Sequence, residues 1–318
     1  MSFDVTTLGE AMIRLWVGHG NRIETTESLR ISVGGSESNV AVALARAGRK
    51  VSWISRLQNS PLGKRIANEL RMHGVDLSAV SWSSAGRTGL YFVELSGPPR
   101  GASVLYDRQT SAASEMSISN TDLAHIANSK LFHLSGISPA LSVTSRELCR
   151  EALKISRSEG LSTTLDVNYR SALWNAADAK KEIIHLASLA TLVVCSSNDA
   201  WDLFGLNQND ENLSQKLSNE LSTSNVVVTQ GSSGVSWILD GRIGSLEASP
   251  AETIDRVGAG DSFMAGVIMG LLDGNIVEGI RKGQAMAGLK RGIYGDQLIS
   301  SESEIIEVLN GENLEIRR

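Results

Sequence analysis

The chain is poor in the residues that build metal and disulfide sites. Its 318 residues include two cysteines, Cys149 and Cys195, and five histidines that are scattered without ligand spacing. No CxxC, HExxH or GxxxxGK[ST] pattern occurs, which argues against zinc chemistry and against a P-loop. Both cysteines stand in apolar surroundings, so we expect buried free thiols in a reducing compartment rather than a disulfide.

The sequence also lacks the marks of nucleic-acid and membrane proteins. Its formal net charge is -5 and no basic block stands out, so we expect no nucleic-acid partner. No apolar run reaches membrane-spanning length and the first residues lack a signal-peptide pattern, so we expect no membrane association and a cytoplasmic location. What is present, 42% hydrophobic and 20% charged residues, is a globular composition.

Strand and helix patterns alternate along most of the chain. Strand patterns occur at residues 5–8, 51–55, 130–134, 162–167, 191–195 and 225–229. Helix patterns occur at residues 36–47, 61–74, 144–159, 178–189 and 263–272. This alternation predicts an α/β fold, with residues 1–318 forming a single domain around a doubly wound, mostly parallel sheet flanked by helices.

Two stretches, residues 10–33 and 87–111, break this alternation. Both are rich in alternating β formers, and residues 90–95 and 103–108 look like paired strands around a turn rich in glycine and proline. A small antiparallel sheet built from both stretches could not bury its apolar face alone. We therefore expect it to form a lid over the main domain or to pair with another subunit.

The most informative segment is DRVGAGDSF, residues 255–263. Gly258 and Gly260 flank Ala259, so the turn is nearly bare of side chains, and a buried helix follows. Such a turn presents backbone N–H groups to an anion at the positive end of the helix dipole. Asp261 stands where it could take a proton from a hydroxyl beside that anion, as phosphoryl transfer to an alcohol requires. An ordinary glycine-rich turn with an aspartate cap explains the same residues equally well.

Residues 34–39, GGSESN, precede an alanine-rich helix. Gly34 and Gly35 would let the backbone approach a polyol, and Asn39 offers both a donor and an acceptor. A loop with a helix cap is the alternative. A third glycine-rich segment, residues 229–234, follows a predicted strand, and it is either a nucleotide loop or a hairpin turn into residues 235–239.

Two arginines favour an acidic ligand. The two-residue period of a strand places Tyr106 and Arg108 on one face of the lid, and Tyr91 and Val93 share a face of the partner strand. A guanidinium beside tyrosine hydroxyls suits a carboxylate, although an exposed arginine on a sheet edge is the alternative. Arg170 follows a predicted central strand at its carboxyl end, where ligands of parallel sheets gather.

Together these segments resemble the ribokinase-like (PfkB) carbohydrate kinases. Residues 255–263 are similar to the C-terminal signature of that family and residues 34–39 to its N-terminal signature, with Gln58 and Asn59 where the family has glycine and aspartate. The resemblance implies an ATP-dependent sugar kinase with a small β-sheet lid. Asp261 would be the catalytic base, and the N–H groups of Gly258, Ala259 and Gly260 would surround the transferring phosphoryl group.

The segments YDR (residues 106–108) and DVNYR (166–170) are similar to those of 2-keto-3-deoxygluconate kinases. This implies phosphorylation of the terminal hydroxyl of that sugar acid, with a fructokinase or ribokinase and a non-catalytic sugar sensor as alternatives. The expected substrate-binding residues are Gly34, Gly35, Asn39, Tyr91, Tyr106, Arg108 and Arg170. The expected nucleotide-binding residues are Asn168, Thr229, Gly231 and Gly234. No G-x-G-x-x-G follows an early strand, which argues against a nicotinamide-dependent oxidoreductase.

The resemblance implies Mg2+ but leaves its ligands open. Relatives use the glutamate of an N-x-x-E motif near the metal, and Trp201 stands at that place here, with Asp199 and Asp202 as alternative acids. Asp255 matches a position near a monovalent-cation site in some relatives, so such a cation is a further candidate. The lid sheet is a dimer surface in the family, which implies a homodimer.

Overall fold

The predicted strands come together in one large sheet. The computed structural model describes residues 2–97, 99–249 and 251–311, and within them a nine-stranded sheet has the order β13-β12-β11-β10-β9-β8-β1-β4-β5. Its strands are β1 (Phe3–Leu8), β4 (Val51–Gln58), β5 (Val80–Ser83), β8 (Ser129–Ser135), β9 (Ser162–Asp166), β10 (Leu192–Ser196), β11 (Asn225–Thr229), β12 (Val235–Leu239) and β13 (Arg242–Leu246). The pairs from β11 to β5 are parallel, and only β12 and β13 add an antiparallel edge.

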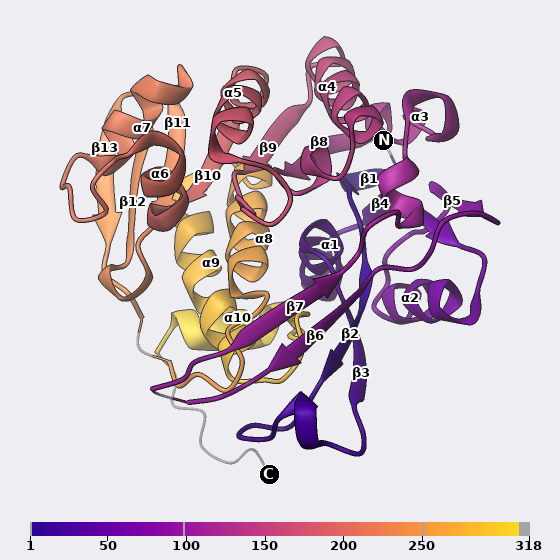
Figure 1. Ribbon diagram of the computed structural model, residues 1–318. Helices are drawn as coiled ribbons and strands as arrows, with labels where there is room; N and C mark the ends of the chain where they lie inside the picture. The colour runs from indigo at the N-terminus through magenta and orange to yellow at the C-terminus, as the bar shows by residue number, and fades with distance from the viewer. Residues whose placement is uncertain (1, 98, 250, 312–318) are drawn as a thin grey trace.

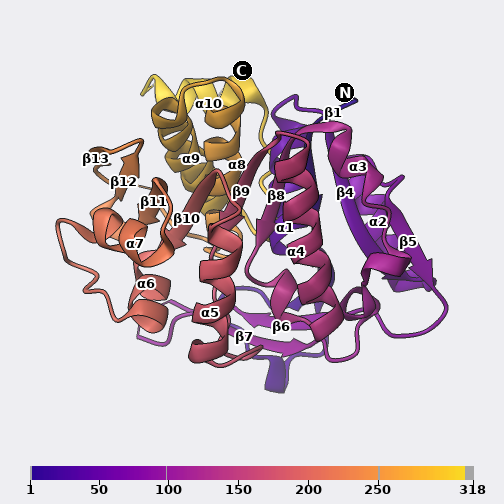
Figure 2. The same ribbon diagram turned by 90° about the horizontal axis from the view of Figure 1, so that it is seen from above.

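Helices cover both faces of this sheet, which confirms the predicted doubly wound α/β fold (Figures 1 and 2). One apolar core contains buried residues of α1 (Ser36–Arg46), α2 (Pro61–Met72), α8 (Ala259–Leu272), α9 (Ile276–Arg291) and α10 (Glu302–Leu309). The other contains buried residues of α3 (Ala124–Ala127), α4 (Val143–Ser158), α5 (Ala176–Ala187), α6 (Ser197–Phe204) and α7 (Leu213–Leu221). Short 3-10 turns are η1 (Ile23–Thr25), η2 (Ala112–Glu115), η3 (Ile118–Asn120), η4 (Ser138–Ala140) and η5 (Gly231–Ser233).

A second, four-stranded sheet, here called the lid, has the order β3-β2-β6-β7. Its strands are β2 (Met12–Trp16), β3 (Arg30–Gly34), β6 (Leu90–Glu94) and β7 (Ser103–Asp107), and it crosses the lower part of the molecule in Figure 1. The prediction of an antiparallel sheet is wrong for one pair, because β2 and β6 run parallel. These strands come from separate stretches of the chain that enter the lid from the same end, so no hairpin sets their direction.

Helices α8 and α9 pack with their backbones in contact. A Cβ atom at Gly266 would lie 2.2 Å from the backbone nitrogen of Gly283, and one at Gly270 would lie 2.3 Å from the Cα of Gly279. The GxxxG pattern of Gly266 and Gly270 thus allows the two helices to pack closely. This packing fixes the first turn of α8, which contains Asp261, against the helix α9.

Two further expectations concern the thiols and the membrane. Cys149 and Cys195 are buried and free, as predicted. Among the helices that the structure describes, none combines the length and the apolar character needed to cross a bilayer.

Candidate active site

Asp261 lies in the first turn of α8, and its side chain is buried. The helix begins after Gly258, which has a φ of 84°. A Cβ atom at Gly258 would lie 1.9 Å from the backbone oxygen of Asp296. Both the left-handed backbone and the lack of space require glycine here. The turn therefore approaches α8 with its backbone uncovered, as the sequence pattern predicted.

Two polar side chains bond the Asp261 carboxylate directly, and a third bonds one of these two. Ser36 Oγ donates to Oδ1 over 2.8 Å, and Asn39 Nδ2 donates to Oδ2 over 2.7 Å. Asn168 Nδ2 donates in turn to Ser36 Oγ over 2.9 Å. Burial raises the pKa of Asp261, whereas the hydrogen bonds from Asn39 and Ser36 lower it. The carboxylate is thus oriented by donors while burial makes it a better proton acceptor.

A cavity of about 730 Å³, here called the inner cavity, lies between the lid and the main sheet, and Asp261 lines it. The structure brings every residue that the sequence suggested for sugar binding to this cavity: Gly34, Gly35, Asn39, Tyr91, Tyr106, Arg108 and Arg170. Glycine is required at the first two positions, because a Cβ atom at Gly34 would lie 2.1 Å from Tyr91 Oη and one at Gly35 would lie 2.0 Å from the backbone oxygen of Glu10.

The two arginines differ in their surroundings. Arg108 is buried and its Nε donates to Glu10 Oε2 over 2.8 Å, with Nη2 bonded to the same oxygen. Glu10 Oε1 is buried without a partner in the described part of the chain, and it belongs to a residue that lines the inner cavity. Arg170 is exposed. Burial raises the pKa of Asp166 and of Asp199, and the positive charge of Arg170 lowers both pKa values in part.

The lid tyrosines form a wall of the same cavity. Tyr91 and Tyr106 are directly opposite each other on β6 and β7, and their rings stack with centroids 5.8 Å apart. The Arg108 guanidinium lies 5.8 Å from the centre of the Tyr106 ring. A cation beside an aromatic face in a partly dry cavity is a stable arrangement.

A buried cluster of three charged side chains joins the lid to the turn before α8, and it was not predicted from the sequence. Arg14 of β2 donates through Nη2 to Asp255 Oδ2 over 2.6 Å and through Nη1 to Asp296 Oδ1 over 2.5 Å. The Arg14 side chain is fully buried. The available signal was a charged residue inside the otherwise apolar strand MIRLW, but its partners lie more than 240 residues away in the chain.

Acidic side chains for a divalent metal lie near Asp261. Asp166 and Asp199 line the inner cavity, and the pKa of Asp166 is raised by burial and then by the charges of Asp261 and Asp199. Trp201 is not among the residues that line this cavity and its side chain is 53% exposed, whereas the two alternative acids, Asp199 and Asp202, both line it. Across the described ranges, no cluster of three or more acidic, histidine or cysteine side chains is arranged to hold a metal ion.

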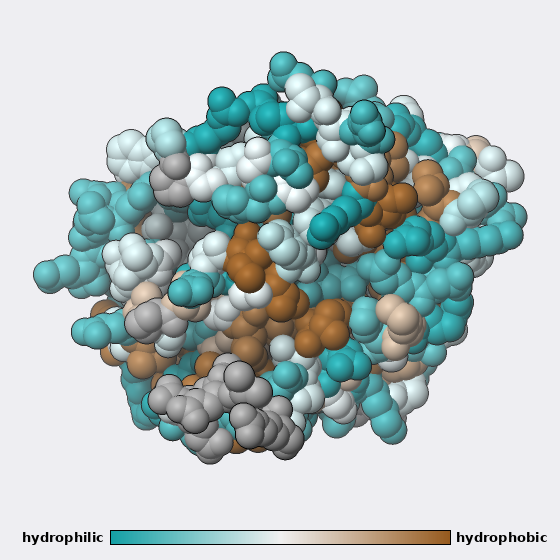
Figure 3. Space-filling view, turned by 90° about the horizontal axis from the view of Figure 1, so that it is seen from below, coloured by the Kyte–Doolittle hydropathy of each residue, from teal (hydrophilic) through white to brown (hydrophobic). Residues whose placement is uncertain are grey.

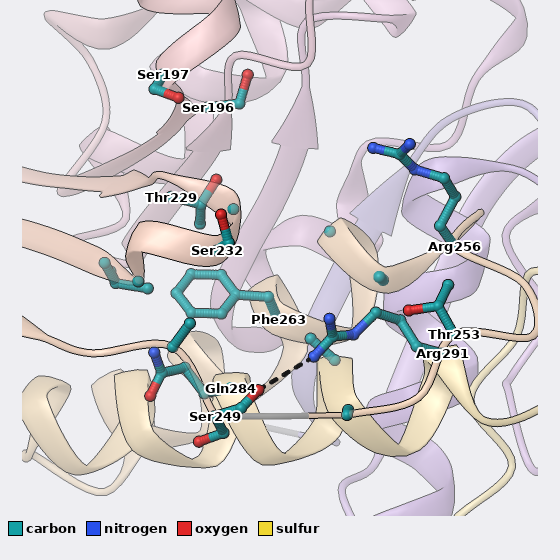
Figure 4. Close-up of a pocket in the computed structure, with 18 of the residues that line it drawn as sticks. Ser196, Ser197, Thr229, Ser232, Ser249, Thr253, Arg256, Phe263, Gln284 and Arg291 are labelled. Atoms are coloured by element: carbon teal, nitrogen blue, oxygen red, sulfur yellow. Dashed lines mark hydrogen bonds between the residues drawn. The ribbon is translucent and has the colours of Figure 1, made fainter. Parts of the chain in front are cut away.

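A larger cavity of about 920 Å³, here called the outer cavity, adjoins the inner one (Figure 4). Of the predicted nucleotide-binding residues, Thr229, Gly231 and Gly234 line it, while Asn168 lines the inner cavity. Residues 229–234 make the hairpin turn between β11 and β12, which confirms that alternative, and residues of the same turn line the outer cavity. In Figure 4, Thr229 and Ser232 lie on one side of Phe263, and Arg256 and Arg291 on the other.

The two cavities meet at the first turn of α8. Gly260, Phe263, Thr229 and Arg256 line both of them, and Ala259 lines the outer one. The Ala259 N–H bonds the Arg256 carbonyl over 3.3 Å, so this predicted anion donor already has a partner. An anion in the outer cavity and an alcohol in the inner cavity would thus meet at the helix N-terminus, beside a carboxylate able to accept a proton.

Comparison with known proteins gives three related findings. The family model for "pfkB family carbohydrate kinase" matches residues 2–303. A 2-dehydro-3-deoxygalactonokinase of Haloferax volcanii is 35% identical over 319 aligned positions, covering 100% of both chains, and a 2-dehydro-3-deoxygluconokinase of Bacillus subtilis is 29% identical, covering 93% of this chain and 92% of its own. The crystal structure of a 2-dehydro-3-deoxygluconokinase from Thermotoga maritima superposes with a TM-score of 0.90 at 30% identity, covering 98% of this chain and 99% of that one.

Proposed function

The chain belongs to the pfkB family of carbohydrate kinases and is an ATP-dependent sugar kinase, and we propose that its substrate is a 2-keto-3-deoxy sugar acid. The proposed acceptor is the terminal hydroxyl of 2-keto-3-deoxygluconate or of its C4 epimer, 2-keto-3-deoxygalactonate. The relatives that act on these two acids, by their names, motivate the choice of epimers. The observation that supports it most directly is the presence of Arg108 and Arg170 in the cavity that contains Asp261, in addition to Arg256 at the junction with the outer cavity.

Arg108 is suited to hold the sugar carboxylate. The Nε and Nη2 groups of Arg108 donate to Glu10, which fixes the plane of the guanidinium and leaves Nη1 of Arg108 as a donor. Arg170 supplies a second positive charge at the wall of the same cavity opposite the lid, and among the described residues it forms no ion pair. The unpartnered Glu10 Oε1 is available to accept a hydrogen bond from a sugar hydroxyl.

The chemistry follows from the position of Asp261. Its carboxylate takes the proton of the terminal hydroxyl while that oxygen attacks the γ-phosphorus, and the bond from phosphorus to the β-phosphate oxygen breaks to release ADP. Backbone N–H groups of Gly258 and Gly260 stabilise the charge on the transferring group, and the Ala259 N–H would contribute only by leaving the Arg256 carbonyl. The lid covers the sugar and excludes water, which would otherwise accept the phosphoryl group.

The residues near the cavity junction fit the ATP and Mg2+ that we propose as cofactors. Thr229, Gly231 and Gly234 would follow the nucleotide, and Asn168 would lie near its phosphates. Asp166 and Asp199 repel one another electrostatically, and a divalent cation would relieve that repulsion. Mg2+ commonly uses one or two carboxylates together with water and phosphate oxygens, and it would neutralise charge on the phosphates.

We also propose that two copies of the chain pair through their lids. All residues of the edge strand β7 are exposed, and Leu105 of this strand has an exposed fraction of 67%. On the other edge strand of the lid, β3, Ile31 has an exposed fraction of 47%. Seen from below, hydrophobic residues gather near the centre of the face (Figure 3). An open, apolar strand edge is a pairing surface. Light scattering should give a dimer mass that Leu105→Asp converts to a monomer mass, and a monomer at assay concentrations without this substitution would contradict the proposal.

The substrate is tested by ADP release across both 2-keto-3-deoxy acids, fructose, ribose and a nucleoside. Arg108→Ala and Arg170→Ala should each raise KM for the sugar acid by about tenfold or more while changing KM for a neutral sugar far less. Arg150→Ala is the control, because Arg150 pairs with Glu182 outside both cavities. Equal effects on acidic and neutral sugars, or a preference for fructose, would contradict carboxylate recognition.

A further inference from the structure

Lys290, near the end of α9, is a fully buried lysine that the mechanism above does not use. Its exposed fraction is 0%, and its ammonium donates to the backbone oxygens of Asp255 over 3.1 Å and of Ile293 over 3.3 Å. Main-chain carbonyls are the ligands that a small bound cation would take. Backbone oxygens therefore stabilise the Lys290 ammonium in the interior, as they would stabilise a bound cation.

The neighbouring charges favour an ammonium at this place. Burial lowers the pKa of Lys290, while the negative charges of Asp255 and Asp296 raise it. A buried charge is retained only where opposite charges and hydrogen bonds compensate for the lost water. Both carboxylates are present here, and both also bind Arg14.

The oxygens of Asp255 are already engaged by groups of the chain. Its Oδ2 accepts from Arg14 Nη2 and from the Gly295 N–H, over 2.6 and 3.1 Å, and its Oδ1 accepts from the Val257 N–H over 3.1 Å. Its backbone oxygen accepts from Lys290. A soluble monovalent cation near Asp255 does not fit this arrangement. The charges of Arg14 and Lys290 would repel the cation, and both groups already bond oxygens of Asp255.

Asp255 begins the turn that shapes the helix N-terminus. The turn runs from Asp255 to Gly258, and the next residues are the first turn of α8 with Asp261. Lys290 fixes the backbone of the first residue of this turn, and the Asp255 side chain fixes the third. A shift of the turn would move the N–H groups that face the phosphoryl group.

We propose that Lys290 is a positioning residue whose ammonium, bonded to the Asp255 and Ile293 carbonyls, holds the 255–258 turn in its anion-binding shape and makes a soluble monovalent cation unnecessary. The inference rests on the kinase activity and not on the identity of the sugar. Any sugar that gives turnover can serve in the test, so an error in the proposed substrate would leave this inference standing.

The first test uses the unaltered protein. ADP release is measured in potassium chloride and in tetramethylammonium chloride at equal ionic strength, because tetramethylammonium is too large for a cation site made of carbonyls. The two kcat values should agree within about twofold, since the fixed ammonium is present in both. Activation by potassium of more than about tenfold would show an open cation site and overturn the proposal.

The second test removes the ammonium. Lys290→Ala should lower kcat by about tenfold to a hundredfold with little change in the sugar KM, because the turn loses its shape and the sugar contacts do not. Ammonium or potassium ions should restore part of this kcat and raise the melting temperature of the variant, whereas tetramethylammonium should do neither. Lys282→Ala is the matched control, since Lys282 lies on the same helix and bonds Asp273 at the far end of α8.

Two outcomes of the variant experiment would contradict the proposal. The first is an unchanged kcat in Lys290→Ala. The second is a loss of kcat that no small cation restores, accompanied by a rise in the sugar KM of the same factor. If Lys290→Ala does not fold, Lys290→Gln replaces it, because the amide can still donate to one carbonyl. A folded Lys290→Gln with lowered kcat and unchanged KM supports the proposal, and full activity overturns it.

Discussion

The side-chain amide of Asn39 donates a hydrogen bond to Asp261 Oδ2 over 2.7 Å. Its own oxygen accepts from the Gly35 N–H over 3.3 Å, so both ends of the amide have protein partners. The sequence suggested Asn39 as a sugar contact, and the structure adds a link between the start of α1 and the start of α8.

Asp261→Asn should lower kcat by about 10³-fold, because an amide cannot accept the hydroxyl proton. The sugar should still bind, since the substituted group is nearly the same size. Turnover is measured by ADP release and sugar binding by calorimetry. Asp273→Asn, at the other end of α8, should leave both unchanged. Near-normal turnover in Asp261→Asn would remove this residue from the role of base.

Asn39→Asp should move the acid limb of the kcat profile to higher pH by about one unit, because a second carboxylate raises the pKa of Asp261. Asn39→Ala should move it in the same direction by less, since a hydrogen bond that lowers this pKa is lost. The profile is recorded with saturating sugar and ATP. An acid limb at the same pH in all three proteins would mean that a different group controls activity.

The two glycines of the turn should respond differently to alanine. Gly258→Ala should lower the free energy of unfolding by about 2 kcal/mol or more, because the residue has a left-handed φ and its Cβ would meet the backbone of Asp296. Gly260→Ala should keep the stability but lower kcat, because its Cβ has free space that opens into both cavities. Urea unfolding and ADP release separate the two effects, and equal stability of the two variants would contradict this account.

Glu37 should make the stability depend on pH. Its Oε1 accepts from the Ser135 N–H, Ser135 Oγ and Ser138 Oγ, and burial raises its pKa from 4.5 to about 7. The folded state therefore binds this proton more tightly than the unfolded state. The resulting stability, about 3 kcal/mol, is complete below pH 4.5 and is lost as the pH rises through about 7.

Glu37→Gln should accordingly flatten the pH dependence of unfolding between about pH 4.5 and 7, because glutamine keeps the acceptor oxygen and cannot lose a proton there. Urea midpoints at several pH values measure this. Glu159→Gln is the control, since Glu159 is exposed. A dependence as steep as in the unsubstituted protein would mean that Glu37 is not the titrating group.

The sequence predicted the fold well where the signal was local. Strand periods identified β1, β4 and β8 to β11 of the large sheet, whereas its edge strands β5 and β13 were not predicted. Glycines at 258 and 260 marked the turn, because a bare backbone is visible in sequence. The Tyr91–Val93 and Tyr106–Arg108 faces followed from the strand period. The start of α1 at Ser36 was placed correctly, whereas α8 begins at Ala259 and not at the predicted residue 263.

The pairings across the chain could not be read in this way. The bond between Glu10 and Arg108 joins residues 98 apart, and Arg14 reaches Asp255 across 241 positions. A strand period gives the face on which a side chain lies but not the group that it meets. Only the position of the Asp255 and Ile293 carbonyls against the end of α9 gives the Lys290 ammonium its two partners.

The contact between α8 and α9 has a consequence for how this protein can vary. Gly266, Gly270, Gly279 and Gly283 touch neither cavity, yet any methyl group there would force two backbones apart. The nearest atoms at Gly266, Gly270 and Gly279 are all backbone, and at Gly283 they include the ring of Phe263, which lines both cavities. Substitution at these four distant positions should therefore disturb the first turn of α8 and Asp261, although none of the four lines a cavity.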